Sequence, residues 1–131
     1  MNLKKKTRKQ LIKELDKVYS KYVRNKYAKN GMVECYTCGV IKPIKEMDCG
    51  HYISRRVMST RWFEKNTKPQ CRACNRFQEG NKPKFALHLK AEYGSGILEE
   101  LDQISRILVK PTNDKLMAMI DYYKRELKKN G

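Results

Sequence analysis

Hydrophobic residues recur with helical spacing near the start of the chain. Over residues 7–27 the apolar positions fall every three or four residues, and lysines occupy the positions between them. This period predicts an amphipathic helix. Thr7 and Gln10, three residues apart, match a capping box that would begin it, and Asn30 with Gly31 would end the segment.

Three more helical patterns occupy the C-terminal part. We expect helices over 85–93 and 97–109, and a last one after Pro111 that Thr112 or Asn113 would cap. The stretch 32–78 has no helical period. Clusters of β-branched and aromatic residues predict short strands over 41–44 and 49–53, and a short helix is expected over 71–79, closed by Gly80.

Basic residues dominate the charge. Thirty Lys+Arg against fourteen Asp+Glu give a net charge of +16 over 131 residues. Such a field favours a polyanion, most often nucleic acid, although ribosomal and membrane-surface proteins share it. No apolar stretch approaches the roughly 20 residues of a membrane span. The N-terminus lacks a signal-peptide pattern, so we expect a cytoplasmic protein.

Four of the five cysteines form two C-x-x-C pairs. Two intervening residues let both sulfurs of a pair face one ion, and four thiolates make a closed tetrahedral Zn²⁺ site. A disulfide pair or free thiols are the alternatives. A reducing cytoplasm and the odd fifth residue, Cys49, disfavour a disulfide scheme. We therefore expect a structural zinc ion held by Cys35, Cys38, Cys71 and Cys74.

A histidine and an asparagine remain once zinc has its ligands. His51 lies between the two pairs, where a neutral imidazole could deprotonate water, although a lone histidine is more often a surface or core residue. Asn75 follows Cys74, and Glu79 would share its face one helical turn later. Their oxygens suit Mg²⁺ or Mn²⁺; a backbone cap and a solvated carboxylate are the plainer interpretation. His88 has no such surroundings.

The order of these residues resembles a known nuclease pattern. C-x-x-C, His51, Asn66, C-x-x-C and Asn75 look like the ββα-metal (HNH) endonuclease motif. More closely, residues 49–56, 60–62, 66–75 and 80–81, with Tyr93-Gly94, resemble the phage recombination protein NinG (Rap) family. The layout is also similar to phage endonuclease VII. The resemblance covers about residues 35–94.

The resemblance implies a structure-specific endonuclease that cuts branched DNA, such as Holliday junctions, with a divalent metal. His51 would be the general base, Asn75 a metal-site residue, and Asn66 the strap of the loop that bears the histidine. Many such nucleases place an aspartate directly before the base, where this chain has Gly50. Residues two apart on a strand share a face, so Asp48 could supply the carboxylate.

Five arginines surround the motif. Guanidinium groups clamp phosphate oxygens, so these side chains are candidate DNA contacts; a solvated basic surface is the alternative. Trp62, between them, is expected in the core. The arginines are Arg55, Arg56, Arg61, Arg72 and Arg76.

Together these patterns predict an α+β, mainly α fold: a zinc-stapled ββα-metal (HNH, treble-clef-like) core with flanking helices. We expect a basic helix over 1–30, the nuclease core over 31–82 and C-terminal helices over 83–131. The predicted function is a metal-dependent endonuclease for branched DNA in phage recombination, dimeric through the first helix or the last two. The alternative is a non-catalytic zinc-containing nucleic-acid-binding module. A helical adaptor fits the charge less well.

Overall fold

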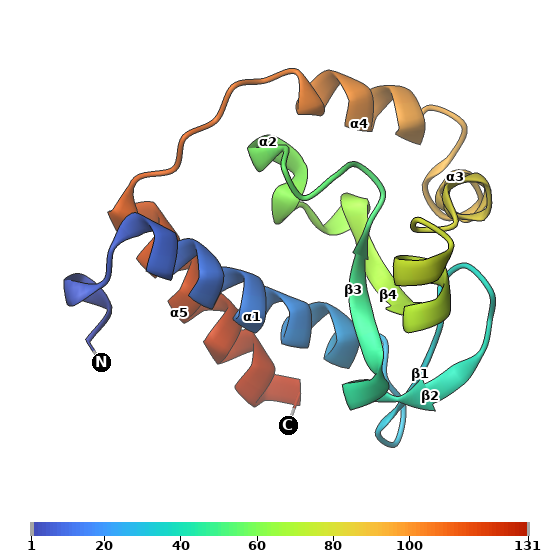
Figure 1. Cartoon of the computed structure of the whole chain (residues 1–131), viewed down its shortest axis with the longest axis horizontal. Helices are drawn as coiled ribbons and strands as arrows, with labels where there is room; N and C mark the ends of the chain where they lie inside the picture. Colours follow the sequence, from blue (N-terminus) through green and yellow to red (C-terminus); the bar gives the residue numbers. More distant parts are fainter. Residues whose placement is uncertain (1, 131) are drawn as a thin grey trace.

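The computed structural model describes residues 2–130 and shows a mainly helical chain with two small antiparallel sheets (Figure 1). The α-helices are α1 (Arg8–Lys26), α2 (Met58–Arg61), α3 (Lys82–Tyr93), α4 (Ile97–Ser105) and α5 (Asn113–Asn130). The strands are β1 (Met32–Glu34), β2 (Ile41–Pro43), β3 (Met47–His51) and β4 (Thr67–Cys71). Short 3-10 turns η1 (Leu3–Lys5), η2 (Ile44–Glu46) and η3 (Glu64–Asn66) and the π-helix η4 (Ala73–Phe77) complete the order. None of the helices described is both long and apolar enough to cross a bilayer.

Helices α1 and α5 lie side by side although they come from opposite ends of the chain (Figure 1). Thr7 begins α1 with the predicted capping box: its hydroxyl accepts from the Gln10 N–H, and the Gln10 side chain accepts from the Thr7 N–H. Each large apolar side chain buried here contributes about 1.5–3 kcal/mol. The apolar stripes of both helices are therefore used within the chain, in a core that includes Leu11, Leu15, Tyr19, Leu116 and Ile120.

The two sheets carry the two C-x-x-C pairs. The β1–β2 hairpin holds the first pair in its turn, where Gly39 adopts a positive φ of 84°. The second pair begins at the end of β4 and runs into η4. The Tyr36 N–H donates to the Pro69 carbonyl at 2.9 Å, which ties the first turn to β4. Two hairpins are thus joined where the cysteines meet.

Strands β3 and β4 and the π-helix η4 form one unit. β3 and β4 pair antiparallel, with Met47 opposite Cys71 and His51 opposite Thr67. Every residue of β4 is buried, because α1 and the cysteine cluster cover it. The chain then turns directly into η4. A strand–strand–helix order therefore surrounds the histidine singled out by the sequence.

Two predicted helices end earlier than expected. The segment over 71–79 is helical only to Phe77, and it is a π-helix, a geometry often found at functional sites. The segment over 97–109 ends at Ser105: Ile97 and Leu101 are buried with residues of α3, whereas Leu108 is exposed. Residues 107–109 are instead exposed in the extended connection to α5 (Figure 1).

Candidate active site

Four cysteine sulfurs converge where the two hairpins meet. The sulfurs of Cys35, Cys38, Cys71 and Cys74 all lie within 4.8 Å of one another, and Cys38 Sγ is 3.7 Å from Cys71 Sγ. A tetrahedron with Zn–S bonds of about 2.3 Å has sulfur–sulfur edges of about 3.8 Å. The Cys74 N–H also points at Cys71 Sγ, at 3.4 Å, as donors to thiolates do. The cluster could hold a structural zinc ion.

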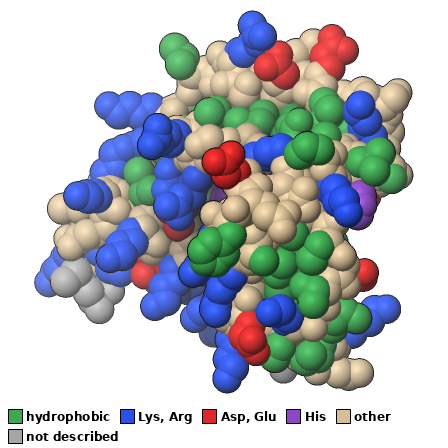
Figure 2. Space-filling model, turned by 45° about the vertical axis from the view of Figure 1, so that its right-hand side comes forward, with side chains coloured by type: hydrophobic (Ala, Val, Ile, Leu, Met, Phe, Trp, Pro, Cys, Tyr) green, Lys and Arg blue, Asp and Glu red, His purple; other side chains and the backbone are tan. Residues whose placement is uncertain are grey.

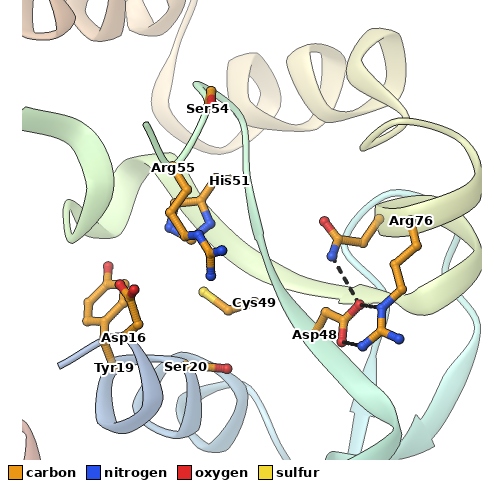
Figure 3. Close-up of a pocket in the computed structure, with 10 residues that line it drawn as sticks. Asp16, Tyr19, Ser20, Asp48, Cys49, His51, Ser54, Arg55 and Arg76 are labelled. Carbon is orange, nitrogen blue, oxygen red and sulfur yellow. Dashed lines mark hydrogen bonds and ion pairs between the residues drawn. The ribbon is translucent and has the colours of Figure 1, made fainter. Parts of the chain in front are cut away.

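A cleft of about 530 Å³ lies beside this cluster, between α1, β3 and η4. Figure 3 shows its lining on both sides of the β3 ribbon. Asp48 and Arg76 lie on one side, while Cys49, His51 and Arg55 lie on the other, facing α1. Alternate residues of a strand point to opposite faces, so β3 supplies both groups. The cleft brings together His51, Asp48, Asn75, Arg55 and Arg76.

His51 is half-buried and held at one ring nitrogen. Its Nε2 lies 2.9 Å from the Arg61 carbonyl oxygen. A carbonyl only accepts, so Nε2 carries the proton and Nδ1 carries the lone pair when the ring is neutral. Burial, the largest cause, lowers the pKa of His51 from its ordinary value, against the opposing effect of the Arg61 carbonyl. When the ring is neutral, Nδ1 is therefore the nitrogen that could accept a proton.

Asn66 is fully buried and binds the chain that follows His51. Its Nδ2 donates to the carbonyls of Ile53 and Thr60, both at 3.1 Å. Its Oδ1 accepts from the Ile53 N–H at 2.8 Å, and its own carbonyl accepts from the Tyr52 N–H at 2.9 Å. Four hydrogen bonds from one residue fix both ends of this loop against β4.

Asp48 and Asn75 are in direct contact. Asn75 Nδ2 donates to Asp48 Oδ2 at 3.0 Å, so Oδ1 is the Asn75 atom that could bind a metal ion. Arg76 makes a bidentate pair with the same carboxylate, Nε to Oδ2 and Nη2 to Oδ1, both at 2.9 Å (Figure 3). Asp48 is only 15% exposed, and Arg76 is 57% exposed. The carboxylate and amide oxygens are hard ligands of the kind that Mg²⁺ and Mn²⁺ prefer.

Gly50 cannot be replaced by the aspartate of the usual nuclease pattern without rearrangement. A Cβ at this position would lie 1.9 Å from Gln70 Oε1 and 2.6 Å from its Cδ. Gln70 is fully buried and is held by hydrogen bonds from Nε2 to the Thr37 hydroxyl, at 3.1 Å, and to the Gly80 carbonyl, at 2.8 Å. The packing of Gln70 therefore excludes a side chain at 50, and Asp48 is the carboxylate that reaches Asn75.

Glu79 does not share a face with Asn75, as the sequence had led us to expect. The π-helix ends at Phe77, and Glu79 adopts a left-handed conformation with a φ of 49° in the turn that follows. It is exposed and is absent from the described residues that line the cleft. The prediction that Glu79 shares a face with Asn75 was wrong because it assumed a continuous α-helix to Gly80.

The five arginines have different surroundings. Arg55 lines the cleft and Arg56 is exposed, while Arg72 donates to the Lys45 carbonyl at 2.9 Å. Arg61 is 16% exposed, and its guanidinium is engaged with the Asp16 carboxylate and the Arg55 carbonyl. The prediction that Arg61 contacts phosphate does not fit this packing. Figure 2 shows lysine and arginine side chains crowding one part of the surface, with few acidic ones among them.

Residues of α1 complete the cleft, and the sequence interpretation had missed them. Asp16, Tyr19 and Ser20 line it opposite β3 (Figure 3). Asp16 falls within the apolar stripe of α1, four residues after Ile12 and three before Tyr19. An acidic residue within a buried stripe is a signal that could have found it. The indole of Trp62, buried as predicted, donates to Asp16 at 2.9 Å.

The family model described as "Bacteriophage Lambda NinG protein" matches residues 1–130. The chain belongs to the NinG family. No curated protein and no solved structure matches it. In this NinG family member the matched region includes α1 and α5 as well as the cysteine cluster and the cleft.

Proposed function

We propose that this protein is a metal-dependent endonuclease with a ββα-metal (HNH-type) site that cuts branched DNA such as Holliday junctions during phage recombination. One observation carries the proposal. A histidine whose Nε2 is tied to a backbone carbonyl lines the same cleft as a paired Asp48 and Asn75, on a strand–strand–helix unit beside four clustered cysteines. A general base and a pair of hard oxygen ligands are what metal-assisted phosphodiester hydrolysis requires.

In this proposal His51 is the general base. Nδ1 takes a proton from a water molecule as the water oxygen attacks phosphorus, and the bond to the leaving oxygen breaks. Asn66 keeps the histidine loop in place through its four hydrogen bonds. Asp48 and Asn75 would hold Mg²⁺ or Mn²⁺, which when bound stabilises negative charge on the phosphate and the leaving oxygen.

Arg76 forms an ion pair with the carboxylate that would bind the metal ion. Its pair with Asp48 neutralises the carboxylate that would bind the metal ion. Because Arg76 is more than half exposed, its guanidinium can leave Asp48 and bind a DNA phosphate instead, where charge-assisted bidentate contacts are also available. Binding of metal and DNA would then release the carboxylate from its arginine.

The cysteine cluster has a structural role in this account. Zn²⁺ bound by the four thiolates would join the β1–β2 turn to η4, the element that carries Asn75. DNA would be held through the net charge of +16 and through exposed arginines such as Arg55, Arg56 and Arg72. Preference for branches would come from shape. The site of action would be the cytoplasm of the bacterial host.

We also propose a homodimer, because two sites related by a two-fold axis could make paired cuts across a junction. The apolar stripes of α1 and α5 pack on each other within one chain, so we place the dimer contact elsewhere. The candidate surface we choose is the segment Ile107, Leu108 and Val109 between α4 and α5, because it exposes three consecutive apolar side chains and Leu108 is 99% exposed. Leu108→Glu should convert a dimer to a monomer in light scattering, and an unchanged mass would reject this contact.

The second candidate is a non-catalytic zinc module that only binds nucleic acid. It is favoured by the Asp48–Arg76 ion pair, which occupies the carboxylate that would otherwise bind a metal ion. The two are separated by incubating the protein with a four-way junction or a linear duplex, in Mg²⁺, in Mn²⁺ and with EDTA. The endonuclease account predicts metal-dependent cutting of the junction that EDTA abolishes, with little cutting of the duplex. Tight junction binding with no cutting in either metal would favour the binding module.

A further inference from the structure

Helix α1 contributes a carboxylate to the cleft that is occupied by protein donors. Asp16 Oδ1 accepts from Arg61 Nε at 3.0 Å and from Trp62 Nε1 at 2.9 Å, and Oδ2 accepts from Arg61 Nη2. The side chains of Asp16 and Arg61 are only 20% and 16% exposed. A fork-shaped pair of this kind fixes the position of the guanidinium more tightly than a single contact. Asp16 therefore fixes the position of residues 61–62 and does not serve as a metal ligand.

The segment that Asp16 holds is the one that holds His51. The carbonyl oxygen of Arg61 receives the Nε2 hydrogen bond of the histidine at 2.9 Å. Arg61 Nη1 also donates to the Arg55 carbonyl at 2.9 Å, so one guanidinium joins both ends of the 55–61 loop. A continuous chain of contacts thus runs from α1 through Arg61 to the ring of His51.

We propose that Asp16 is a positioning residue: through Arg61 it fixes the carbonyl that keeps His51 in the Nε2–H form with Nδ1 free to accept a proton. The expected effect of Asp16 on DNA cutting rests on the proposed function above. The expected effect on the tautomer of His51 does not. Helix α1 is then part of the catalytic apparatus and not only a basic extension. The complete fork needs a carboxylate: an amide oxygen could replace Oδ1, which accepts from Arg61 Nε and the indole, but the amide nitrogen would then face Arg61 Nη2, donor against donor.

Asp16→Asn is the test, and the chain offers a matched control. Glu14 is on the same helix but pairs outside the cleft, with Lys6 at 3.7 Å and Lys124 at 3.6 Å. Glu14→Gln therefore makes the same charge change without touching Arg61. Asp16→Glu retains the carboxylate and should restore part of whatever Asp16→Asn loses.

Two measurements are needed on the zinc-loaded full chain. Nitrogen-15 NMR of the imidazoles reports which ring nitrogen is protonated, and the chain has only two histidines, so His88 is an internal reference. We expect His51 to be in the Nε2–H form in the wild type and in Glu14→Gln, and to lose that preference in Asp16→Asn. In junction cutting, kcat of Asp16→Asn should fall by about 10- to 100-fold, the usual scale for groups that orient a reacting residue, while the Kd for junction is unchanged.

A folded Asp16→Asn protein with the wild-type tautomer and wild-type kcat would overturn the inference. If that variant does not fold, Arg61→Lys replaces it: the positive charge stays, the fork is lost, and the same loss of tautomer preference is expected. A wild-type tautomer in Arg61→Lys would likewise overturn it. If the wild type does not cut DNA at all, the proposed function fails, but the tautomer comparison still decides whether Asp16 positions His51.

Discussion

The absence of a side chain at position 50 can be tested by adding one. In Gly50→Ala the new Cβ would lie 1.9 Å from Gln70 Oε1, far inside van der Waals contact, so the Gln70 side chain must move. Its movement breaks the hydrogen bonds to Thr37 and Gly80. At about 0.5–1.5 kcal/mol for each of the two bonds and about 1–3 kcal/mol for overpacking, the free energy of unfolding should fall by about 4 kcal/mol.

Thermal unfolding monitored by circular dichroism measures this loss. For a chain of this size about 4 kcal/mol corresponds to a fall in Tm of about 15 °C. Gly96→Ala is the control, because nothing lies within 4 Å of a Cβ there. In a Gln70→Ala background the obstacle is gone, so Gly50→Ala should cost less than about 1 kcal/mol. Equal costs with and without Gln70 would refute the explanation that Gln70 excludes the usual aspartate.

Three further outcomes are expected. Purified protein should contain about one Zn²⁺ per chain, and Cys71→Ser should unfold the region around the cluster; zinc-free protein that is still folded would contradict this. Burial lowers the pKa of His51, so the imidazole stays unprotonated to lower pH. The acid limb of the pH–rate profile should therefore lie below about pH 6.5, the ordinary histidine value. An acid limb above that pH would contradict His51 as the base. Arg55→Ala should make the slope of log K for DNA binding against log[salt] shallower by about 0.9. Arg61→Ala should instead lower the free energy of unfolding by about 1–3 kcal/mol. The opposite pattern would reject Arg55 as a phosphate contact and Arg61 as a structural residue.

Local signals in the sequence were sufficient for parts of this structure. The capping box of Thr7 and Gln10 and the apolar period after it placed the start and buried face of α1. The spacing of the C-x-x-C pairs predicted the convergence of the four sulfurs, because two residues between cysteines restrict where the thiols can point. Asp48 was placed on the Gly50 side of β3 by strand alternation, and it contacts Asn75.

Features that depend on tertiary contacts could not be predicted from the sequence. Asp16 and Arg61 are 45 residues apart, and nothing local to either one indicates their pairing. Glu79 was misplaced because the chain changes from a π-helix to a left-handed turn, after which the Gly80 N–H donates to the Cys74 carbonyl at 2.9 Å. The apolar stripe predicted α4 to run to 109, but its buried residues are Ile97 and Leu101, near its start, and the helix ends at Ser105.

In the proposed function His51 performs the chemistry, and DNA binding does not require it. The most direct measurement compares cutting and binding of one four-way junction by wild type, His51→Ala and His88→Ala in the same metal buffer. His88 makes a hydrogen bond to the Tyr36 carbonyl and lies away from the cleft, so it controls for the loss of an imidazole. We expect His51→Ala to bind the junction as the wild type does without cutting it, and His88→Ala to bind and cut it. Wild-type cutting rates in His51→Ala would contradict this expectation.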